Sequence, residues 1–129
     1  MANTEPAPGL QAPDFTEQRN DALREGVKGL FLMNGGGAVA MLAFLQAIWT
    51  DKPQLAKYVV VSITFLAAGV FLAGVVQFFR YHASFNFQGG RLCAFKVYRF
   101  LYLSAAYGSL TAFLVGVLVV VSGAWHALN

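Results

Sequence analysis

The chain has 129 residues, of which 57% are hydrophobic and only 12% are charged, and its formal net charge is +3. Soluble domains carry roughly 25% charged residues, so this composition excludes an ordinary soluble protein. The single cysteine, Cys93, excludes an internal disulfide framework. The length suits one small domain.

The N-terminal segment MANTEPAPGLQAP is rich in proline and has no apolar periodicity, which predicts a disordered tail over 1–13. A helix can begin at Asp14, because DFTE places an acid at the cap position and Glu17 three residues later. The remaining domain, 14–129, therefore opens with a polar stretch that ends before Gly29 and is expected to project into water. Its mixed charges are unlike a cleaved signal peptide, so the first helix is expected to be a permanent anchor.

Three runs of the sequence contain no Asp, Glu, Lys or Arg: 29–49, 58–79 and 100–129. The first two are about 20 residues long, the length that a helix needs to cross the hydrocarbon of a bilayer, and the third contains a span at 100–125. Pro53 favours a new helix start after the short connection TDKPQ. Gly89-Gly90 favours a second helix end. We predict an all-α integral membrane protein, with three long transmembrane helices in an up-down-up antiparallel bundle.

The basic residues indicate the orientation of this bundle. Most of them lie in the N-terminal stretch and around the second connection, whereas the other side carries only Lys52 and Lys57. The positive-inside rule then places the N-terminus in the cytoplasm and the C-terminus outside. Trp49 and Trp125 both fall at the outer boundary, where indole rings are enriched.

The segment RYHASFNFQGGRLCAFKVYRFLY interleaves bases with aromatic residues around the second connection. Such a pattern could bind nucleic acid, since bases stack on aromatic rings. The membrane boundary explains it better, because basic and aromatic residues are both enriched there. We predict that its bases contact lipid headgroups or a partner protein; they are Arg80, Arg91, Lys96 and Arg99.

Small residues recur at helical spacing in every predicted span. Lipid is as apolar as leucine, so membrane helices associate through close contact between small residues and through hydrogen bonds. We predict that these faces pack the helices together: Gly36, Ala40, Ala43 and Ala47 in the first span, Ser62, Gly69 and Ala73 in the second, and Ser104, Gly108, Ala112 and Gly116 in the third.

The run MNGGGAVAML raises the alternative that the first helix is broken to form an ion or substrate site. Three glycines in a helix cost ~3 kcal/mol relative to alanine. Unwinding within hydrocarbon leaves several backbone groups unsatisfied, at several kcal/mol each. An intact, closely packed helix is therefore the favoured interpretation.

Each predicted span contains at least one polar residue that we expect to lie near the cytoplasmic edge of the membrane. We predict a layer of inter-helix hydrogen bonds, in which Asn34 pairs directly with Gln77 and the third helix contributes Ser104 and Tyr107. A small polar binding pocket is the alternative interpretation of the same residues.

Residues that would support catalysis or ion coupling are missing from the spans. None contains the acid, base or histidine that a proton relay needs at membrane depth, and no nucleophile–base pair, phosphate loop or metal-ligand cluster is recognisable. His82 and His126 are predicted at opposite ends, so one chain cannot bring them to one metal or haem. Cys93 is predicted to be an interfacial thiol. We predict no enzymatic activity and no cofactor.

The run ALREGVKGLFLMNGGGAVAMLAFL resembles, over residues 23 to 45, a group of small uncharacterised bacterial inner-membrane proteins. The resemblance implies a bacterial multi-pass protein of three or four helices, located in the inner membrane. It carries no activity or catalytic residue.

The sequence is therefore interpreted as a non-enzymatic membrane protein, an oligomer-forming or accessory subunit. Its expected partners are membrane lipids and itself or another membrane protein, and not nucleic acid. The alternative is a small oligomeric pore or permease whose path is lined by Asn34, Gln77 and Ser104. A holin has a similar size, but the expected orientation and the lack of a charged C-terminal tail disfavour it.

Overall fold

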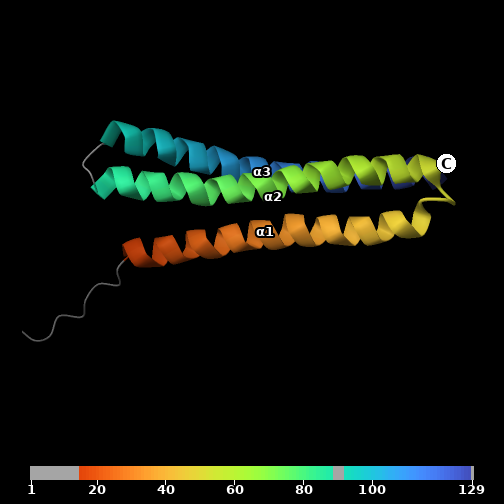
Figure 1. The fold of residues 1–129 in the computed structure, drawn as a ribbon, viewed down its shortest axis with the longest axis horizontal. Coiled ribbons are helices and arrows are strands. Elements are labelled where there is room, and N and C mark those ends of the chain that lie inside the picture. Colours follow the sequence, from red (N-terminus) through yellow and green to blue (C-terminus); the bar gives the residue numbers. More distant parts are fainter. Residues whose placement is uncertain (1–14, 89–91, 129) are drawn as a thin grey trace, which may run out of the picture.

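The computed structural model of the protein describes residues 15–88 and 92–128, and its regular structure there is entirely helical. Helix α1 covers Phe15–Ile48, α2 covers Pro53–Gln88 and α3 covers Leu92–Leu128. They run antiparallel, up, down and up, as long neighbouring rods (Figure 1). All three are long and apolar enough to span a membrane. The predicted all-α bundle of three spanning helices is confirmed.

The connection between α1 and α2 is a tight turn centred on Lys52. The Lys52 amide donates to the Ile48 carbonyl at 2.9 Å, which extends the last turn of α1. The Lys52 carbonyl accepts from the Ala56 amide at 3.0 Å, which closes the first turn of α2. Pro53 is the first residue of α2, where its missing N–H is not needed. The tail 1–13, the predicted cap at Asp14, the Gly89-Gly90 helix end and Arg91 lie outside the described residues.

Helix α1 continues without interruption through Asn34 and the three glycines that follow it. The alternative of a broken first helix is therefore contradicted. Only Gly37 makes a close contact on the inner side, where a Cβ atom would lie 3.4 Å from Leu66 of α2. At Gly36 a Cβ atom would meet nothing within 4 Å. The glycines are tolerated because the helix keeps every backbone hydrogen bond within the segment.

Helix α2 is the central element of the bundle. It packs along its length against α3, less extensively against α1, and α1 meets α3 at few points. Apart from Ala56, the residues that α2 buries follow alternating spacings of four and three, with one interval of seven at the end, which is the period of left-handed helix packing. We call this row the α2 seam; it consists of Leu55, Val59, Ser62, Leu66, Gly69, Ala73, Val76 and Ala83.

Glycines of α3 allow large side chains of α2 to lie close to the α3 backbone. A Cβ atom at Gly123 would lie 2.5 Å from the Tyr58 Cγ, and one at Gly116 would lie 3.3 Å from the Leu66 Cγ. Gly116 and Gly123 are buried, and so is Ser109, one heptad earlier. A spacing of seven keeps small residues on one side of a helix, because seven residues turn it almost two full times.

The predicted packing faces need two corrections. In α1, the four small residues of the predicted face are all exposed, so this face does not pack against the described parts of α2 and α3; they are Gly36, Ala40, Ala43 and Ala47. The reason is Asn34, which faces inward. Gly36 is two residues further on and therefore lies about 200° around the helix.

In α3, Ser104 is exposed, Gly108 and Ala112 are half-buried, and only Gly116 is buried. A spacing of four advances about 40° around the helix at each step. Over three steps the predicted row therefore leaves the packed side. The predicted residues of α2, Ser62, Gly69 and Ala73, all lie in the seam.

Candidate functional site

Asn34 is the polar centre of the bundle. Its side chain is fully buried, although it lies within the apolar stretch of α1. The amide nitrogen donates to the Leu30 carbonyl at 3.1 Å in its own helix and to the Ser109 Oγ of α3 at 3.2 Å. A longer contact of 3.4 Å reaches the Ser109 carbonyl. Asn34 thus links α1 to α3, two helices that otherwise touch little.

Ser109 extends this link to the third helix. Its hydroxyl accepts from Asn34 and donates to the Gly69 carbonyl of α2 at 2.8 Å. The three helices are therefore joined by one chain of two hydrogen bonds. We call Asn34, Ser109 and Gly69 the polar junction. Inter-helix bonds of this kind contribute about 0.6–2 kcal/mol each in membranes.

Gly69 allows α1 and α2 to approach each other at the polar junction. A Cβ atom at Gly69 would lie 2.0 Å from Asn34 Oδ1 and 2.5 Å from its Cγ, distances that no side chain permits. Asn34 Oδ1 is buried and has no N–H or O–H donor among the described residues. The direction of the missing Cβ shows that a Gly69 Cα–H bond points at this oxygen. A Cα–H···O contact, worth perhaps 0.5–1 kcal/mol, partly offsets its desolvation.

A second polar group, the Ser62 hydroxyl, lies one heptad before Gly69 in the α2 seam. It is buried without a hydrogen-bond partner among the described residues. Leu66, which is 1% exposed, fills the seam between Ser62 and the polar junction. Across the described part of the bundle, the buried polar groups are therefore separated by apolar side chains and form no continuous path.

The predicted polar layer is brought together only in part. Asn34 lies inside the bundle, but Gln77, Ser104 and Tyr107 are exposed. The predicted pairing of Asn34 with Gln77 is wrong, because Asn34 bonds to Ser109. Ser109 is not among the residues predicted from the sequence. The seven-residue spacing of Ser109, Gly116 and Gly123 was the signal that could have identified it.

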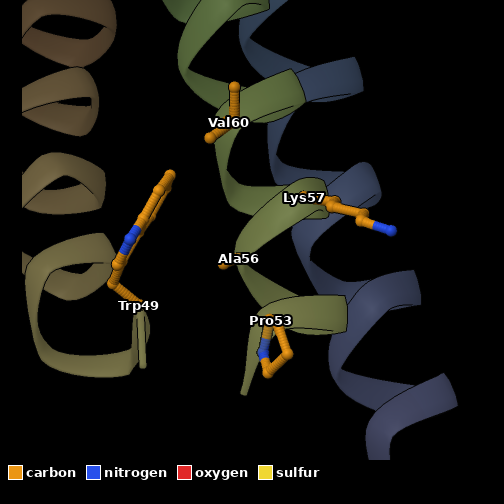
Figure 2. Close-up of a pocket in the computed structure, with 5 residues that line it drawn as sticks. All are labelled: Trp49, Pro53, Ala56, Lys57 and Val60. Carbon is orange, nitrogen blue, oxygen red and sulfur yellow. The ribbon is translucent and has the colours of Figure 1, made fainter. Parts of the chain in front are cut away.

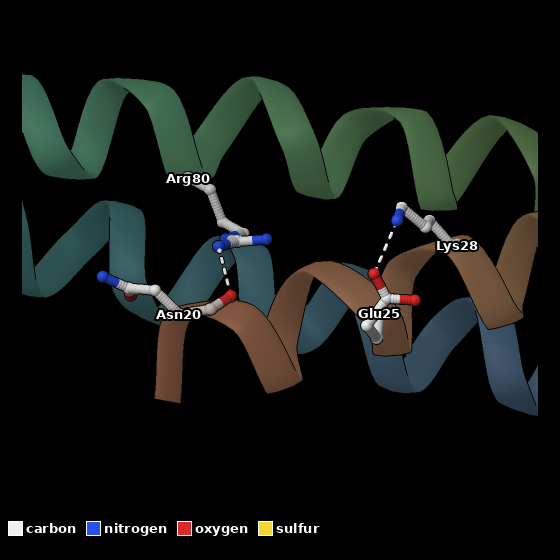
Figure 3. Close-up of polar contacts among 4 residues, drawn as sticks. All are labelled: Asn20, Glu25, Lys28 and Arg80. Carbon is white, nitrogen blue, oxygen red and sulfur yellow. Dashed lines mark hydrogen bonds and ion pairs between the residues drawn. The ribbon is translucent and has the colours of Figure 1, made fainter. Parts of the chain in front are cut away.

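The end of the bundle near the α2–α3 connection is rich in cations. Arg80 is half-buried, and its guanidinium donates to the Asn20 carbonyl at 3.5 Å, a long contact that joins α2 to the start of α1 (Figure 3). Lys28 pairs with Glu25 on the exposed side of α1 at 2.5 Å. Such exposed pairs contribute little to stability. Of the other predicted lipid or partner contacts, Lys96 and Arg99 are exposed on α3.

The two histidines lie at opposite ends of the bundle. His82 is surrounded by the rings of Phe78, Tyr81 and Tyr98, with centroid distances of 4.4, 5.6 and 5.6 Å. His126 stacks on Tyr58 at 6.4 Å near the α1–α2 turn. Each imidazole therefore takes part in an aromatic contact between α2 and α3, His82 with Tyr98 and His126 with Tyr58. Cys93 is exposed at the start of α3.

A groove of about 450 Å³ lies between the end of α1 and the start of α2. It is lined by Trp49, Pro53, Ala56, Lys57 and Val60 (Figure 2). The indole ring covers its α1 side, and the Lys57 amine points away from the indole. The groove is apolar and holds no pair of groups that could exchange a proton.

Comparison with known proteins finds no family model, no curated protein and no solved structure that matches this chain.

Proposed function

We propose that this chain is a non-enzymatic, multi-pass integral membrane protein that acts by assembling with itself or with another membrane protein. The three helices are compatible with a membrane protein by length and composition. The polar junction supports a structural role for the buried polar groups, because its donors are used in bonds between helices. No titratable group takes part in it, and its one hydroxyl, that of Ser109, donates to the Gly69 carbonyl and has no basic side chain as a hydrogen-bond partner among the described residues.

The observation that carries this proposal is the exposed small-residue face of α1, made of Gly36, Ala40, Ala43 and Ala47. Space is open at Gly36, where a Cβ atom would meet nothing within 4 Å. Small residues in a membrane helix allow the backbone of another helix to approach closely. No helix among residues 15–88 and 92–128 packs on this face, so a second chain is its natural partner.

The proposed location is a bacterial inner membrane, with the N-terminus in the cytoplasm. The distribution of charge supports it, since Arg80, Lys96 and Arg99 surround one end of the bundle and Lys52 and Lys57 lie at the other. Cations near the cytoplasmic leaflet gain about 1 kcal/mol each from anionic headgroups.

Chemical crosslinking in native membranes tests the assembly, followed by mass measurement of the protein in mild detergent. We expect species heavier than the monomer. The variant Gly36→Leu fills the open space on the small-residue face and should reduce, at least several-fold, the yield of those species in which this face contacts a second chain. Gly26→Leu is the matched control, because Gly26 is also exposed and also has open space, but lies outside the charge-free span. A protein that is exclusively monomeric would contradict the proposal.

The alternative is a pore or small permease assembled from several copies. Its supporting observation is that Gln77 and Ser104 are exposed at membrane depth, where they could line a path between chains. Asn34 cannot line such a path, because it is buried within one chain. Solute flux through purified protein in liposomes separates the two functions. Flux that Gln77→Leu abolishes would favour the pore.

A further inference from the structure

The outward side of α3 carries hydroxyl groups in the middle of its apolar run. Ser104, Tyr107 and Thr111 are spaced by three and four residues, so they share one side of the helix, and all three are exposed. Apolar residues continue this side in both directions. We call the whole set the α3 outer face; it consists of Phe100, Ser104, Tyr107, Thr111, Leu114, Leu118 and Val121.

Tyr107 is the residue of this face whose side chain is least compatible with surrounding lipid. It lies eight residues past Arg99, the last charged residue of α3, which is about 12 Å along the helix. A tyrosine side chain extended towards that end covers about half this distance. Its hydroxyl therefore stays in the hydrocarbon layer, whereas tyrosine is normally enriched at the membrane boundary.

The Tyr107 hydroxyl has no hydrogen-bond partner among residues 15–88 and 92–128. The Thr111 hydroxyl, by contrast, donates to the Tyr107 carbonyl at 2.9 Å and is satisfied within its helix. A polar group without a partner in hydrocarbon is strongly unfavourable, because nothing replaces its lost hydration. This cost is removed when a neighbouring helix offers an acceptor at the same depth.

The outward side of α2 carries large apolar side chains, as is usual for a surface that faces lipid. Its residues Phe71, Phe78 and Phe85 recur every seven positions, are all well exposed, and carry no polar atom on the side chain. The corresponding residues of α1, Leu32 and Val39, are also apolar. Gln77 of α2 is also exposed, but it lies only three residues from Arg80, which is about 4.5 Å along the helix and therefore near the boundary. On the α3 outer face, by contrast, a side-chain donor without a partner among the described residues lies deep in the apolar run.

We propose that the α3 outer face binds the same face of a second copy of this chain, with the two α3 helices parallel. This inference rests on the assembly stated above and names the partner and the surface. Two copies inserted in one membrane share an orientation, so a twofold axis along the membrane normal places equal residues at equal depth. The surface therefore has to be complementary to itself.

The α3 outer face satisfies that requirement. Side chains on a helix lean towards its N-terminus, so the Tyr107 hydroxyl reaches over the preceding turn, where Ser104 lies. In a parallel pair the Tyr107 hydroxyl meets the Ser104 hydroxyl of the second copy, which is an acceptor. The twofold axis forms this hydrogen bond twice, and Leu114 and Leu118 pack beyond it. The small-residue face of α1 stays free for a further chain.

Cysteine crosslinking tests the surface. In a full-length Cys93→Ser background, single cysteines are placed at Leu114 on α3, Phe71 on α2 and Val39 on α1, all of them exposed. Mild oxidation of native membranes should produce a covalent homodimer from Leu114→Cys and at most a tenth of that yield from the other two.

Each other outcome overturns the inference, and the outcomes differ in what they say about assembly. Homodimers formed only through Phe71→Cys or Val39→Cys would refute the α3 surface and leave self-assembly intact. Adducts formed only with a different protein would refute the second copy and leave the accessory role intact. A protein that is monomeric throughout would refute both the inference and the proposed function.

The hydrogen bond is tested by Tyr107→Phe, which removes one hydroxyl and preserves the ring. We expect the dissociation constant of the dimer in detergent to rise about 3- to 20-fold for each bond lost. Tyr81→Phe is the matched control, because Tyr81 is 69% exposed and Tyr107 is 70% exposed. Equal effects of the two variants, or no effect of Tyr107→Phe, would contradict the inter-chain bond.

Discussion

The contact between α2 and α3 and the contact that holds α1 depend on different physical terms. Along α2 and α3, large and small side chains alternate in a seven-residue period, and Gly116 and Gly123 accept Leu66 and Tyr58. Helix α1 is attached over less of its surface, and Asn34 is its fully buried side chain. The first contact is therefore distributed and depends on shape. The second has fewer apolar contacts, such as that of Val27 with Val76 and Ala105, and depends more on the hydrogen bonds of the polar junction.

This difference predicts where a single substitution separates the two contacts. A change at the polar junction should release α1 and leave α2 and α3 paired. A change at the far end of the α2 seam should weaken the α2–α3 pair and leave Asn34 bonded. The following variants test these expectations, in order of decreasing effect.

Gly69→Ala should have the largest effect. The new Cβ atom would overlap Asn34 Oδ1 at 2.0 Å, so α1 has to move away and the junction loses its bonds, at a cost of about 3 kcal/mol. Unfolding in mixed micelles followed by circular dichroism measures this loss. Gly74→Ala is the matched control, because its Cβ atom would meet only Phe31 at 3.8 Å.

Removing the overlapping group should rescue part of that loss. The double variant Gly69→Ala with Asn34→Ala is expected to be more stable than the sum of the two single changes predicts, by at least about 1 kcal/mol. Strict additivity would show that the loss of stability in Gly69→Ala does not come from overlap with the Asn34 side chain.

Gly123→Ala should weaken the α2–α3 pair by about 1–3 kcal/mol. Its Cβ atom would overlap the Tyr58 Cγ at 2.5 Å and Cβ at 2.6 Å, and the Tyr58 Cβ cannot move without the α2 backbone. The stability of the α2–α3 pair can be measured in a protein that already carries Asn34→Ala. Gly36→Ala, which fills open space, should be neutral or slightly stabilising. Equal losses at both glycines would contradict a shape-dependent contact.

Asn34→Ala and Ser109→Ala should be coupled by about 0.6–2 kcal/mol in a double-mutant cycle, since the two side chains share a hydrogen bond of 3.2 Å. The same cycle for Asn34→Ala and Gln77→Ala should be additive, because Gln77 is exposed. Coupling to Gln77 in place of Ser109 would overturn the geometry of the junction.

Ser62→Ala should have the smallest effect and the opposite sign. The Ser62 hydroxyl is buried without a partner among the described residues, so its removal relieves a desolvation cost and should leave the free energy of unfolding unchanged or about 1 kcal/mol higher. Ser109→Ala, which removes a bonded hydroxyl of the same size, should destabilise. A large loss from Ser62→Ala would reveal a partner for this hydroxyl.

The sequence predicted the helices better than their faces, and two pairs of residues show why. Asn34 was expected to face a neighbouring helix, and so was Gly36, yet residues two apart point about 200° away from each other. Only one of them can lie inside, and the buried amide is the one that does. In α3, the row Ser104–Gly108–Ala112–Gly116 and the row Ser109–Gly116–Gly123 were both present in the sequence. Only contact with α2 shows which of them is buried.

The sequence by itself determined the number of helices, their approximate ends and their ability to span a membrane. These properties depend on local chemistry, namely charge-free runs, one proline and the need to satisfy each backbone group inside hydrocarbon. The tertiary structure decided how each helix is rotated about its axis. Large apolar residues occur on every side of the spans of α2 and α3, so burying one side in place of another changes hydrophobic energy little. Their rotation depends instead on where Asn34, Ser109 and three glycines fit against a neighbour.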